Sequence, residues 1–282
     1  MQCPSPINIQ RPNGGGSKDR IVVGCGQCPV CLGNKRSDWT FRIHEEMRIA
    51  KTAYFMTLTL SDDYLTFSKE TGESTLNKAD IQTFHKLLRY YITEHIKGQE
   101  WPPYRFYATG EYGTKGTERP HYHIIAFNIP EKVTGFLTKI WGKGFVETSV
   151  VTPGRIHYVT KYILNTYDEY PGRQKPFALM SRRPGLGSNY FDDKAKWNIQ
   201  NDYFHVINQQ GQKQNMPYYY RRVFNADTIS KRNEDIRKDT DKNTLIRRAE
   251  IIKAGDNPAD VRQKQIENIN RRNLKIKKSG TL

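Results

Sequence analysis

Two histidines separated by one residue, His121 and His123, carry the sharpest chemical signal in the sequence. On a β-strand alternate side chains point to the same face, so both imidazoles can bind one divalent ion. With seven histidines in the chain, such a triplet arises by chance in roughly one chain in six. Paired histidines at a sheet surface also often only pack or form hydrogen bonds. The metal assignment therefore depends on the neighbouring residues.

A carboxylate precedes the histidine pair at Glu111. A hairpin joining the strands that carry Glu111 and the histidines brings the carboxylate beside the imidazoles. The resulting nitrogen and oxygen donors suit Mg²⁺ or Mn²⁺ with open positions for phosphate oxygens. A single glutamate at a strand end is more often only solvated, so its role as a ligand stays open.

Two tyrosines, Tyr158 and Tyr162, are spaced four residues apart with Lys161 between them. On a helix this spacing puts both hydroxyls on one face, with the lysine beside them. Tyrosine attacks a phosphate only when a metal or nearby cations assist, because its ordinary pKa is about 10. The chain has seventeen tyrosines, so core packing on an amphipathic helix is the alternative interpretation.

The four cysteines, Cys3, Cys25, Cys28 and Cys31, all lie within the first thirty-one residues. In a reducing cytosol such a cluster indicates metal ligands more than disulfides. A structural zinc bound by the four thiolates is the leading prediction. An iron-sulfur cluster of the ferredoxin type needs a further Cys-Pro downstream, which the sequence lacks. Reduced thiols without a metal are the other alternative.

The elements that must position these residues mix helices and strands without strict alternation. Hydrophobic periodicity predicts helices over residues 35–50, 78–95 (with Asn77 as N-cap), 130–141, after which Pro153-Gly154 breaks the chain, and 156–164. Alternation of apolar and polar residues predicts strands over residues 54–60, 104–111, 121–128 and 145–151. This pattern favours an α+β fold with a central, largely antiparallel sheet flanked by helices.

The charge of the chain points to a polyanionic partner. The formal net charge is +16 and the isoelectric point is about 9.6, and clustered Lys and Arg gain free energy by displacing counterions from nucleic acid. We expect no membrane partner and a cytosolic location, because the sequence lacks a long apolar run or a signal core. Basic and aromatic residues together predict a groove for single-stranded nucleic acid, formed by Arg182, Arg183, Arg221 and Arg222 with Phe177, Tyr190 and Tyr218 to Tyr220.

The order of these motifs resembles the rolling-circle replication initiators of the microviruses, in particular the gokushovirus group of the HUH endonuclease superfamily. The similarity spans about residues 1–225. It is carried by Cys25-Gly-Gln-Cys-Pro-Val-Cys31, Thr57-Leu-Thr59, Gly110-Glu-Tyr-Gly113, Arg119-Pro-His-Tyr-His123, Trp141-Gly-Lys-Gly-Phe-Val146, Tyr158-x3-Tyr162, Met180-Ser-Arg-Arg-Pro-Gly-Leu-Gly187 and Met216-Pro-Tyr-Tyr-Tyr-Arg221.

The resemblance implies a palm-like sheet and site-specific nicking and rejoining of DNA at a phage origin through a 5′-phosphotyrosyl intermediate. His121 and His123 would hold the metal, Glu111 would be a less certain third ligand, and Tyr158 and Tyr162 would be the nucleophiles. The expected partners are single-stranded DNA, origin DNA and the replication machinery in the cytoplasm of a bacterial host. A host helicase is expected because the sequence has no phosphate-binding loop for ATP-driven unwinding.

The sequence divides into three predicted segments: a Cys-rich zinc segment with a docking helix (1–50), a nicking domain (51–225) and a basic, helical or partly disordered tail (226–282). A zinc-dependent regulator that binds DNA or RNA without catalysis is the competing function. In that case the Cys cluster and the positive charge act, and the histidines are structural.

Overall fold

The computed structural model describes residues 3, 5–10, 20–113, 118–161, 170–201, 203, 205–221, 238, 242 and 245–278. They form two compact units, Lys35–Asp193 and a second one composed of Met1–Asn34 with Lys194–Leu282. The α+β class and the central antiparallel sheet flanked by helices are confirmed. The three segments predicted from composition stay a prediction.

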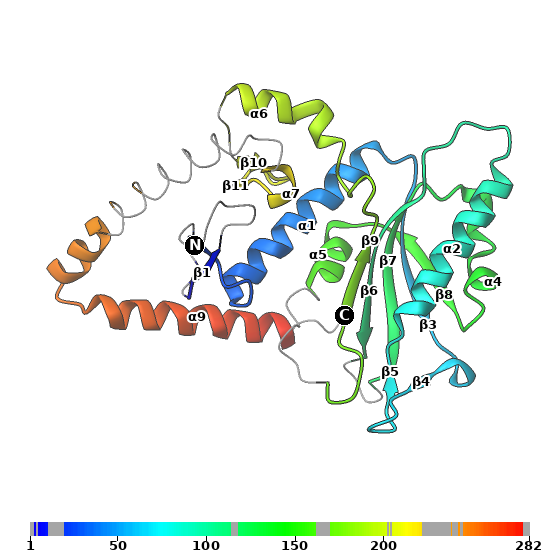
Figure 1. Ribbon diagram of the computed structural model, residues 1–282, viewed down its shortest axis with the longest axis horizontal. Helices are drawn as coiled ribbons and strands as arrows, with labels where there is room; N and C mark the ends of the chain where they lie inside the picture. Colours follow the sequence, from blue (N-terminus) through cyan, green and yellow to red (C-terminus); the bar gives the residue numbers. More distant parts are fainter. Residues whose placement is uncertain are drawn as a thin grey trace. The chain divides into compact units, whose positions relative to one another are not determined.

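A five-stranded antiparallel sheet forms the centre of the Lys35–Asp193 unit (Figure 1). In spatial order its strands are β8 (Val146–Val150), β3 (Ala53–Thr59), β7 (Pro120–Phe127), β6 (Arg105–Tyr112) and β9 (Phe177–Met180). The first four agree with the predicted strands to within one residue at each end. The short edge strand β9 is not predicted, because four residues give too little alternation to detect.

The sheet has an apolar core on each face. Helices α2 (Lys78–His95), α3 (Glu131–Thr134) and α4 (Leu137–Trp141) cover one face, where the buried side chains include Leu58, Tyr122 and Ile124. Helix α5 (Pro153–Lys161) and the part of α1 (Pro29–Ile49) from Lys35 onward cover the other, where they include Phe55, Tyr107 and Ile125. Figure 1 shows the two sets of helices on opposite sides of the sheet. Strand alternation divides the apolar residues between the faces.

The helix starts follow from capping chemistry, and they correct three predictions. Helix α2 begins as predicted, and the Asn77 side chain accepts a hydrogen bond from the amide of Ala79 at 3.0 Å. Helices α1 and α5 instead begin at Pro29 and Pro153, earlier than predicted, because proline suits the first helical position. The single helix predicted over residues 130–141 is two short helices, and α3 ends at Gly135.

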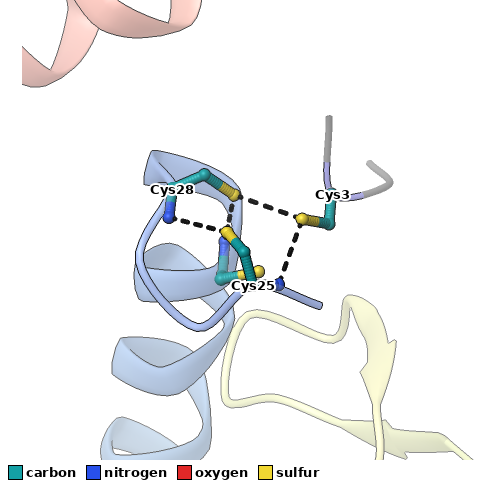
Figure 2. Close-up of side chains that lie close together, drawn as sticks. Cys3, Cys25 and Cys28 are labelled. Atoms are coloured by element: carbon teal, nitrogen blue, oxygen red, sulfur yellow. Dashed lines mark hydrogen bonds between the residues drawn. The ribbon is translucent and has the colours of Figure 1, made fainter. Parts of the chain in front are cut away.

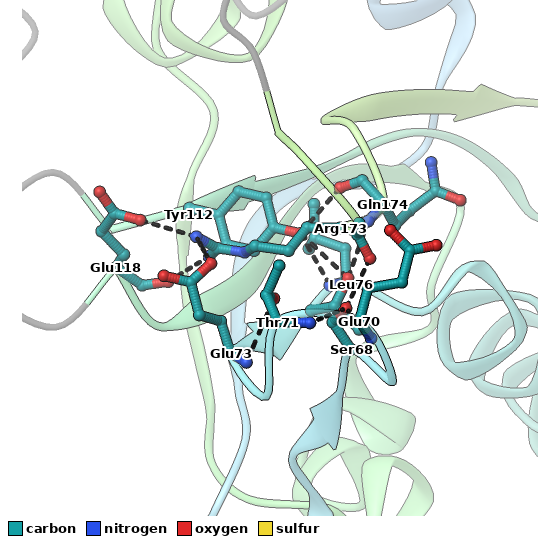
Figure 3. Close-up of polar contacts among 11 residues, drawn as sticks. Ser68, Glu70, Thr71, Glu73, Leu76, Tyr112, Glu118, Arg173 and Gln174 are labelled. Atoms are coloured by element: carbon teal, nitrogen blue, oxygen red, sulfur yellow. Dashed lines mark hydrogen bonds and ion pairs between the residues drawn. The ribbon is translucent and has the colours of Figure 1, made fainter.

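A network of polar contacts ties residues 172–174 to the neighbouring hairpin (Figure 3). That hairpin is β4 (Thr66–Phe67) and β5 (Ser74–Thr75). The Arg173 guanidinium pairs with Glu118 at 2.8 Å and lies 4.0 Å over the ring of Tyr112. The Tyr112 hydroxyl donates a hydrogen bond to the Gln174 carbonyl oxygen at 2.7 Å. The end of β6, next to Glu111, is thereby fixed by contacts beyond the sheet itself.

The second unit contains short elements around the cysteines. Its strands form two hairpins, β1 (Ile7–Gln10) with β2 (Arg20–Val23) and β10 (His205–Ile207) with β11 (Lys213–Asn215). The remaining elements are the 3-10 turn Asp62–Tyr64 in the larger unit, the π-helical turn Phe191–Ala195, and helices α6 (Lys196–Gln200), α7 (Tyr218–Arg221) and α9 (Pro258–Lys278). The predicted helical character of the tail is confirmed over α9. Within the described ranges, no helix has both the length and the apolarity needed to cross a bilayer.

Candidate active site

Three side chains with metal-binding atoms meet on the α5 face of the sheet. In the β6–β7 register Glu111 pairs with His121, and Thr109 pairs with His123. All four residues therefore face the same side, and the histidines follow one another along β7. The ligand atoms of Glu111, His121 and His123 lie within 4.8 Å of one another. The expected gathering of the carboxylate and the two imidazoles by a hairpin is what the structure contains.

The carboxylate of Glu111 is the centre of the contacts. Its Oε1 atom accepts a hydrogen bond from His121 Nε2 at 3.0 Å and lies 2.5 Å from His123 Nε2. The Tyr158 hydroxyl donates a hydrogen bond to the same oxygen at 2.9 Å. Glu111 is 1% exposed, and among the described residues its Oε2 atom has no hydrogen-bond partner. Leaving a buried carboxylate oxygen unpaired costs about 1–3 kcal/mol or more, which is typical of a ligand held ready for a cation.

Helix α5 brings Tyr158 to the histidines. The ring of Tyr158 meets that of His123 edge to face, with centroids 4.9 Å apart. The helix is held against the sheet by Ile156 and Val159, both fully buried. Tyr158 is thus placed at the ligands by apolar packing on either side of it in the sequence. Tyr162, the second predicted nucleophile, lies outside the described residues.

The electrostatics of the site favour a carboxylate beside charged imidazole. Burial raises the pKa of Glu111, but the hydrogen bond from His121 and the closeness of His123 outweigh it, so the pKa is lowered from its ordinary value. Burial lowers the pKa of His121, and the hydrogen bond and charge of Glu111 reverse this effect and raise it. The pKa of the Tyr158 hydroxyl is raised by burial and by the charge of Glu111. Tyr158 is therefore protonated until a cation offsets that carboxylate.

Partners on neighbouring strands orient both imidazoles. His123 Nδ1 lies 3.1 Å from the hydroxyl of Thr57 on β3, and His121 Nδ1 lies 3.1 Å from the carbonyl oxygen of Arg119. These contacts leave both Nε2 atoms facing Glu111. The Thr109 hydroxyl is buried beside His123 and has no partner in the described part of the chain. Thr57 belongs to a motif noted in the sequence, but its contact with His123 depends on strand pairing and could not be predicted locally.

Two cations accompany the tyrosine on α5. Lys161 is buried, and burial lowers its pKa while the charge of Glu111 acts in the opposite direction. Arg36 on α1 donates a hydrogen bond to the carbonyl oxygen of His157 at 3.2 Å, and its charge also acts on Lys161. The sequence predicts a role for Lys161 but gives no signal for Arg36, which reaches α5 from a helix 121 residues earlier.

The donor set fits a divalent cation. Two imidazole nitrogens and one carboxylate oxygen leave positions open for water or phosphate oxygens on Mg²⁺, Mn²⁺ or a similar ion. The unpaired Oε2 atom of Glu111 supplies a further oxygen donor in the same place. The residues present therefore can bind the metal that the sequence predicts.

The four cysteines form a second group of metal-binding atoms, in the other unit. The Sγ atoms of Cys3, Cys25, Cys28 and Cys31 lie within 4.8 Å of one another. Figure 2 shows three of these residues with their mutual hydrogen bonds: the Cys25 amide donates to Cys3 Sγ at 3.3 Å, and the Cys28 amide donates to Cys25 Sγ at 3.2 Å. Amide hydrogen bonds to sulfur stabilise thiolates, the form that binds zinc.

The local backbone suits this cluster. The amides of Cys28 and Gln27 lower the pKa of Cys25 to about 6, whereas burial raises the pKa of Cys31 to about 12. A Cβ atom at Gly24 would lie 2.8 Å from Cys31 Sγ, so only glycine lets this backbone approach the sulfur without displacing it. Four sulfur donors fit a tetrahedral structural zinc, and one thiol is already predisposed to ionise.

The basic and aromatic residues predicted to form one groove have different environments. Tyr190 is buried against Phe41, with ring centroids 5.6 Å apart, and Tyr220 is fully buried in the other unit. Both rings therefore serve packing rather than base stacking. Tyr218 is exposed, and Arg222 lies outside the described residues.

Comparison with known proteins places the sheet and its site in a replication family. Residues 53–167 match the family model of the replication-associated protein ORF2. This stretch includes β3, β6 and β7, the Glu111, His121 and His123 group, and Tyr158. The class of protein indicated by the match is thus a phage replication-associated protein.

Three curated phage proteins are similar to the chain. Replication-associated protein ORF2 of Spiroplasma virus 4 is 27% identical over 256 residues, covering 79% of this chain and 78% of the relative. Replication-associated protein VP4 of Bdellovibrio phage phiMH2K is 24% identical and covers 70% and 65%, respectively. Replication-associated protein ORF4 of Chlamydia phage 1 is 27% identical over 158 residues, covering 49% of the chain and 37% of the relative. The predicted resemblance to microvirus replication initiators is confirmed.

Proposed function

We propose that the chain is a rolling-circle replication initiator of the HUH class that nicks and rejoins single-stranded DNA at a phage origin. The observation that carries the proposal is the contact of the Tyr158 hydroxyl with Glu111 Oε1 at 2.9 Å, beside both histidines. A nucleophile, a metal-binding group and buried cations therefore meet at one point on the sheet. The similarity to phage replication-associated proteins supports the same function.

The reaction is a transesterification at one phosphodiester. Bound by Glu111, His121 and His123, Mg²⁺ or Mn²⁺ supplies Lewis-acid polarisation of the phosphate. The Tyr158 oxygen attacks phosphorus, the bond from phosphorus to the 3′ oxygen breaks, and the phenolic proton ends on that oxygen. The products are a 5′-phosphotyrosyl enzyme and a free 3′-hydroxyl, so the later reverse attack rejoins the strand.

Two cations of the chain act on the reacting phosphate in this proposal. Lys161 lies one turn after Tyr158 on the same helix, and Arg36 is held to α5 through His157. Their positive charges stabilise negative charge that develops on the phosphate oxygens in the transition state. Because Lys161 is buried, its charge acts through less water than a surface lysine would.

Tyr162 gives the proposal a second nucleophile. Rolling-circle synthesis must cut the regenerated origin while the first 5′ end is still covalently bound, which a second hydroxyl makes possible. On a helix the two tyrosines are one turn apart, so each could reach the same phosphate in turn. The opposing model has Tyr158 as the single nucleophile and Tyr162 as a packing residue.

The partners in this proposal are single-stranded and origin DNA, a host helicase and the host replication machinery, in the bacterial cytoplasm. The net charge of +16 supports binding to DNA. The Cys cluster holds one structural zinc, which supports folding. The competing proposal, a zinc-dependent regulator that only binds nucleic acid, is favoured by the same Cys cluster and charge.

A covalent-adduct experiment separates these proposals. The protein is incubated with single-stranded oligonucleotides tiling the cognate origin and Mg²⁺ or Mn²⁺, and the products are resolved on a denaturing gel. A nickase gives a protein-DNA adduct and a fragment with a 3′-hydroxyl, whereas a regulator gives neither. Tyr158→Phe and Tyr162→Phe each retain part of the nicking and the double variant has none. Tyr90→Phe, at an exposed ring on α2, is the control.

Peptide mapping of the adduct tests the alternation of the two tyrosines. Adducts at both residues support it. An adduct at one tyrosine only, which disappears when that residue is changed to Phe, refutes alternation and leaves the single-nucleophile model.

A further inference from the structure

The turn from Trp141 to Phe145 is fixed to the end of β3. The Trp141 indole donates a hydrogen bond to the Thr59 carbonyl oxygen at 2.7 Å, and the Thr59 amide donates to the Phe145 carbonyl oxygen at 3.0 Å. A Cβ atom at Gly144 would collide with the Thr59 carbonyl, so this close approach requires glycine. The backbone that carries Phe145 is therefore held firmly in place.

The other side chains of the turn are directed to the α2 face of the sheet. Trp141 is buried there, and Lys143 Nζ pairs with Asp80 of α2 at 2.6 Å. Asp80 is itself buried and accepts a hydrogen bond from the Tyr122 hydroxyl at 3.3 Å. These contacts account for the lysine and the tryptophan of the motif as structural anchors. They do not account for Phe145, which is 79% exposed.

Strand alternation puts Phe145 on the same face as the candidate active site. Val146 pairs with Leu58 and packs against the α2-side core, so its neighbour Phe145 points to the opposite face. On that face Thr59 lies between Phe145 and His121, which is its partner in the β3–β7 register. Two strand spacings separate Phe145 from His121, about 10 Å. Stacked single-stranded DNA spans this distance with roughly three nucleotides.

A cation lies on the same side of the sheet end. The Arg119 guanidinium donates two hydrogen bonds to the Leu60 carbonyl oxygen, at 2.6 and 3.2 Å, one residue beyond Thr59. Its side chain is 39% exposed and also pairs with the exposed Asp62 at 2.6 Å. An exposed aromatic ring next to a fixed, accessible guanidinium is the combination that binds the bases and phosphates of a single strand.

We propose that Phe145 is a stacking platform for a nucleobase of the single-stranded DNA, within about three nucleotides of the scissile phosphate. This inference rests on the proposed nicking function and adds to it how the substrate strand is positioned. A rigid ring positions the strand with little loss of side-chain entropy, because the turn is already fixed before DNA binds. Stacking tolerates any base, so Phe145 fixes where the strand lies and not its sequence.

The test compares three substitutions at Phe145 by fluorescence anisotropy with fluorescein-labelled (dT)15, without added Mg²⁺ or Mn²⁺. Phe145→Ala and Phe145→Leu weaken binding roughly 5- to 100-fold, because neither offers a planar ring. Phe145→Trp binds like the wild type, and its added tryptophan emission is quenched by (dT)15. Val150→Ala, at a 73% exposed position on β8, is the matched control and binds like the wild type.

Three outcomes overturn the inference: wild-type affinity in both the Ala and Leu variants, equal weakening by Val150→Ala, or no quenching in the Trp variant. Circular dichroism melting confirms that each variant is folded. The proposed nicking function is tested separately by the covalent adduct. An adduct with unchanged binding at Phe145→Ala refutes the platform alone, whereas wild-type protein without any adduct refutes the nicking function.

Discussion

The Glu-His-His group and the Cys cluster both bring metal-binding atoms within 4.8 Å, but the chain positions them in different ways. Glu111, His121 and His123 lie on two central strands of a five-stranded sheet with apolar cores on both faces. The cysteines lie in short loops and at the start of α1, and their polar contacts are largely with one another. The comparison suggests that one site is organised before a metal binds, and that the other depends on its metal for structure.

Zinc removal is the largest expected effect, and it tests the Cys side of the comparison. Structural zinc sites contribute apparent binding free energies of about 10–16 kcal/mol in small domains. We expect one zinc per chain by elemental analysis, and its loss in Cys28→Ser should make the Met1–Asn34 segment sensitive to protease while Lys35–Asp193 stays resistant. Zinc-free protein purified without chelator, or protein that contains iron, would contradict this assignment.

Changing the ligands on the sheet should affect the chemistry and leave the fold intact. We expect His121→Ala with His123→Ala to lower metal-dependent cleavage by roughly 10³-fold or more, with little change in single-strand binding or in melting temperature. Glu147→Gln, at an exposed carboxylate paired with Thr57 on the same face, is the matched control. Full cleavage by the double variant would remove the metal assignment, and unfolding of it would remove the contrast with the cysteines.

A smaller effect is expected from the hydroxyl that orients His123. Thr57→Val keeps the shape of the side chain and removes the 3.1 Å contact with His123 Nδ1. Outer partners of metal ligands contribute about 10- to 100-fold in affinity or activity, so the Mg²⁺ or Mn²⁺ concentration for half-maximal cleavage should rise by that factor. Thr59→Val, one pair further along the same strand, is the comparison. Identical metal dependence in Thr57→Val and the wild type would show that the sheet alone orients the imidazole.

The smallest effect concerns a histidine that is not in either metal-binding group. His85 on α2 stacks on Phe106 with ring centroids 3.5 Å apart, and its Nδ1 atom lies 2.8 Å from the Tyr104 hydroxyl. Burial, with the charge of Arg89, keeps the pKa of His85 well below 6.5 in the folded state. Below pH 6.5 the unfolded chain therefore binds a proton that the folded chain does not, and stability falls as the pH falls.

The expected slope is about 1.4 kcal/mol per pH unit between pH 6.5 and the folded pKa. Urea unfolding at several pH values measures it, and His85→Gln should have a slope shallower by that amount. Equal slopes in the two proteins would mean that His85 is accessible to protons when folded. Such a result would also weaken the view that this sheet holds its side chains rigidly.

Sequence reasoning predicted the parts of the site that depend on local periodicity. The His121 and His123 pair, its strand and the partner strand with Glu111 follow from alternation, and α2 follows from its apolar face and the Asn77 cap. Contacts between distant segments could not be predicted in this way. The approach of Tyr158 to Glu111 spans 47 residues and that of Arg36 to α5 spans 121, and both depend on which face each helix covers.

The discontinuous unit that contains the cysteines has a consequence for synthesis on the ribosome. Its first part ends at Asn34, and its second part begins at Lys194. At about 5–20 residues per second, the intervening chain takes roughly 8 to 30 seconds to make. During that interval all four thiols have been synthesised, while the sheet folds from residues that follow them. The cluster can therefore acquire its metal from the nascent chain, before its own unit is complete.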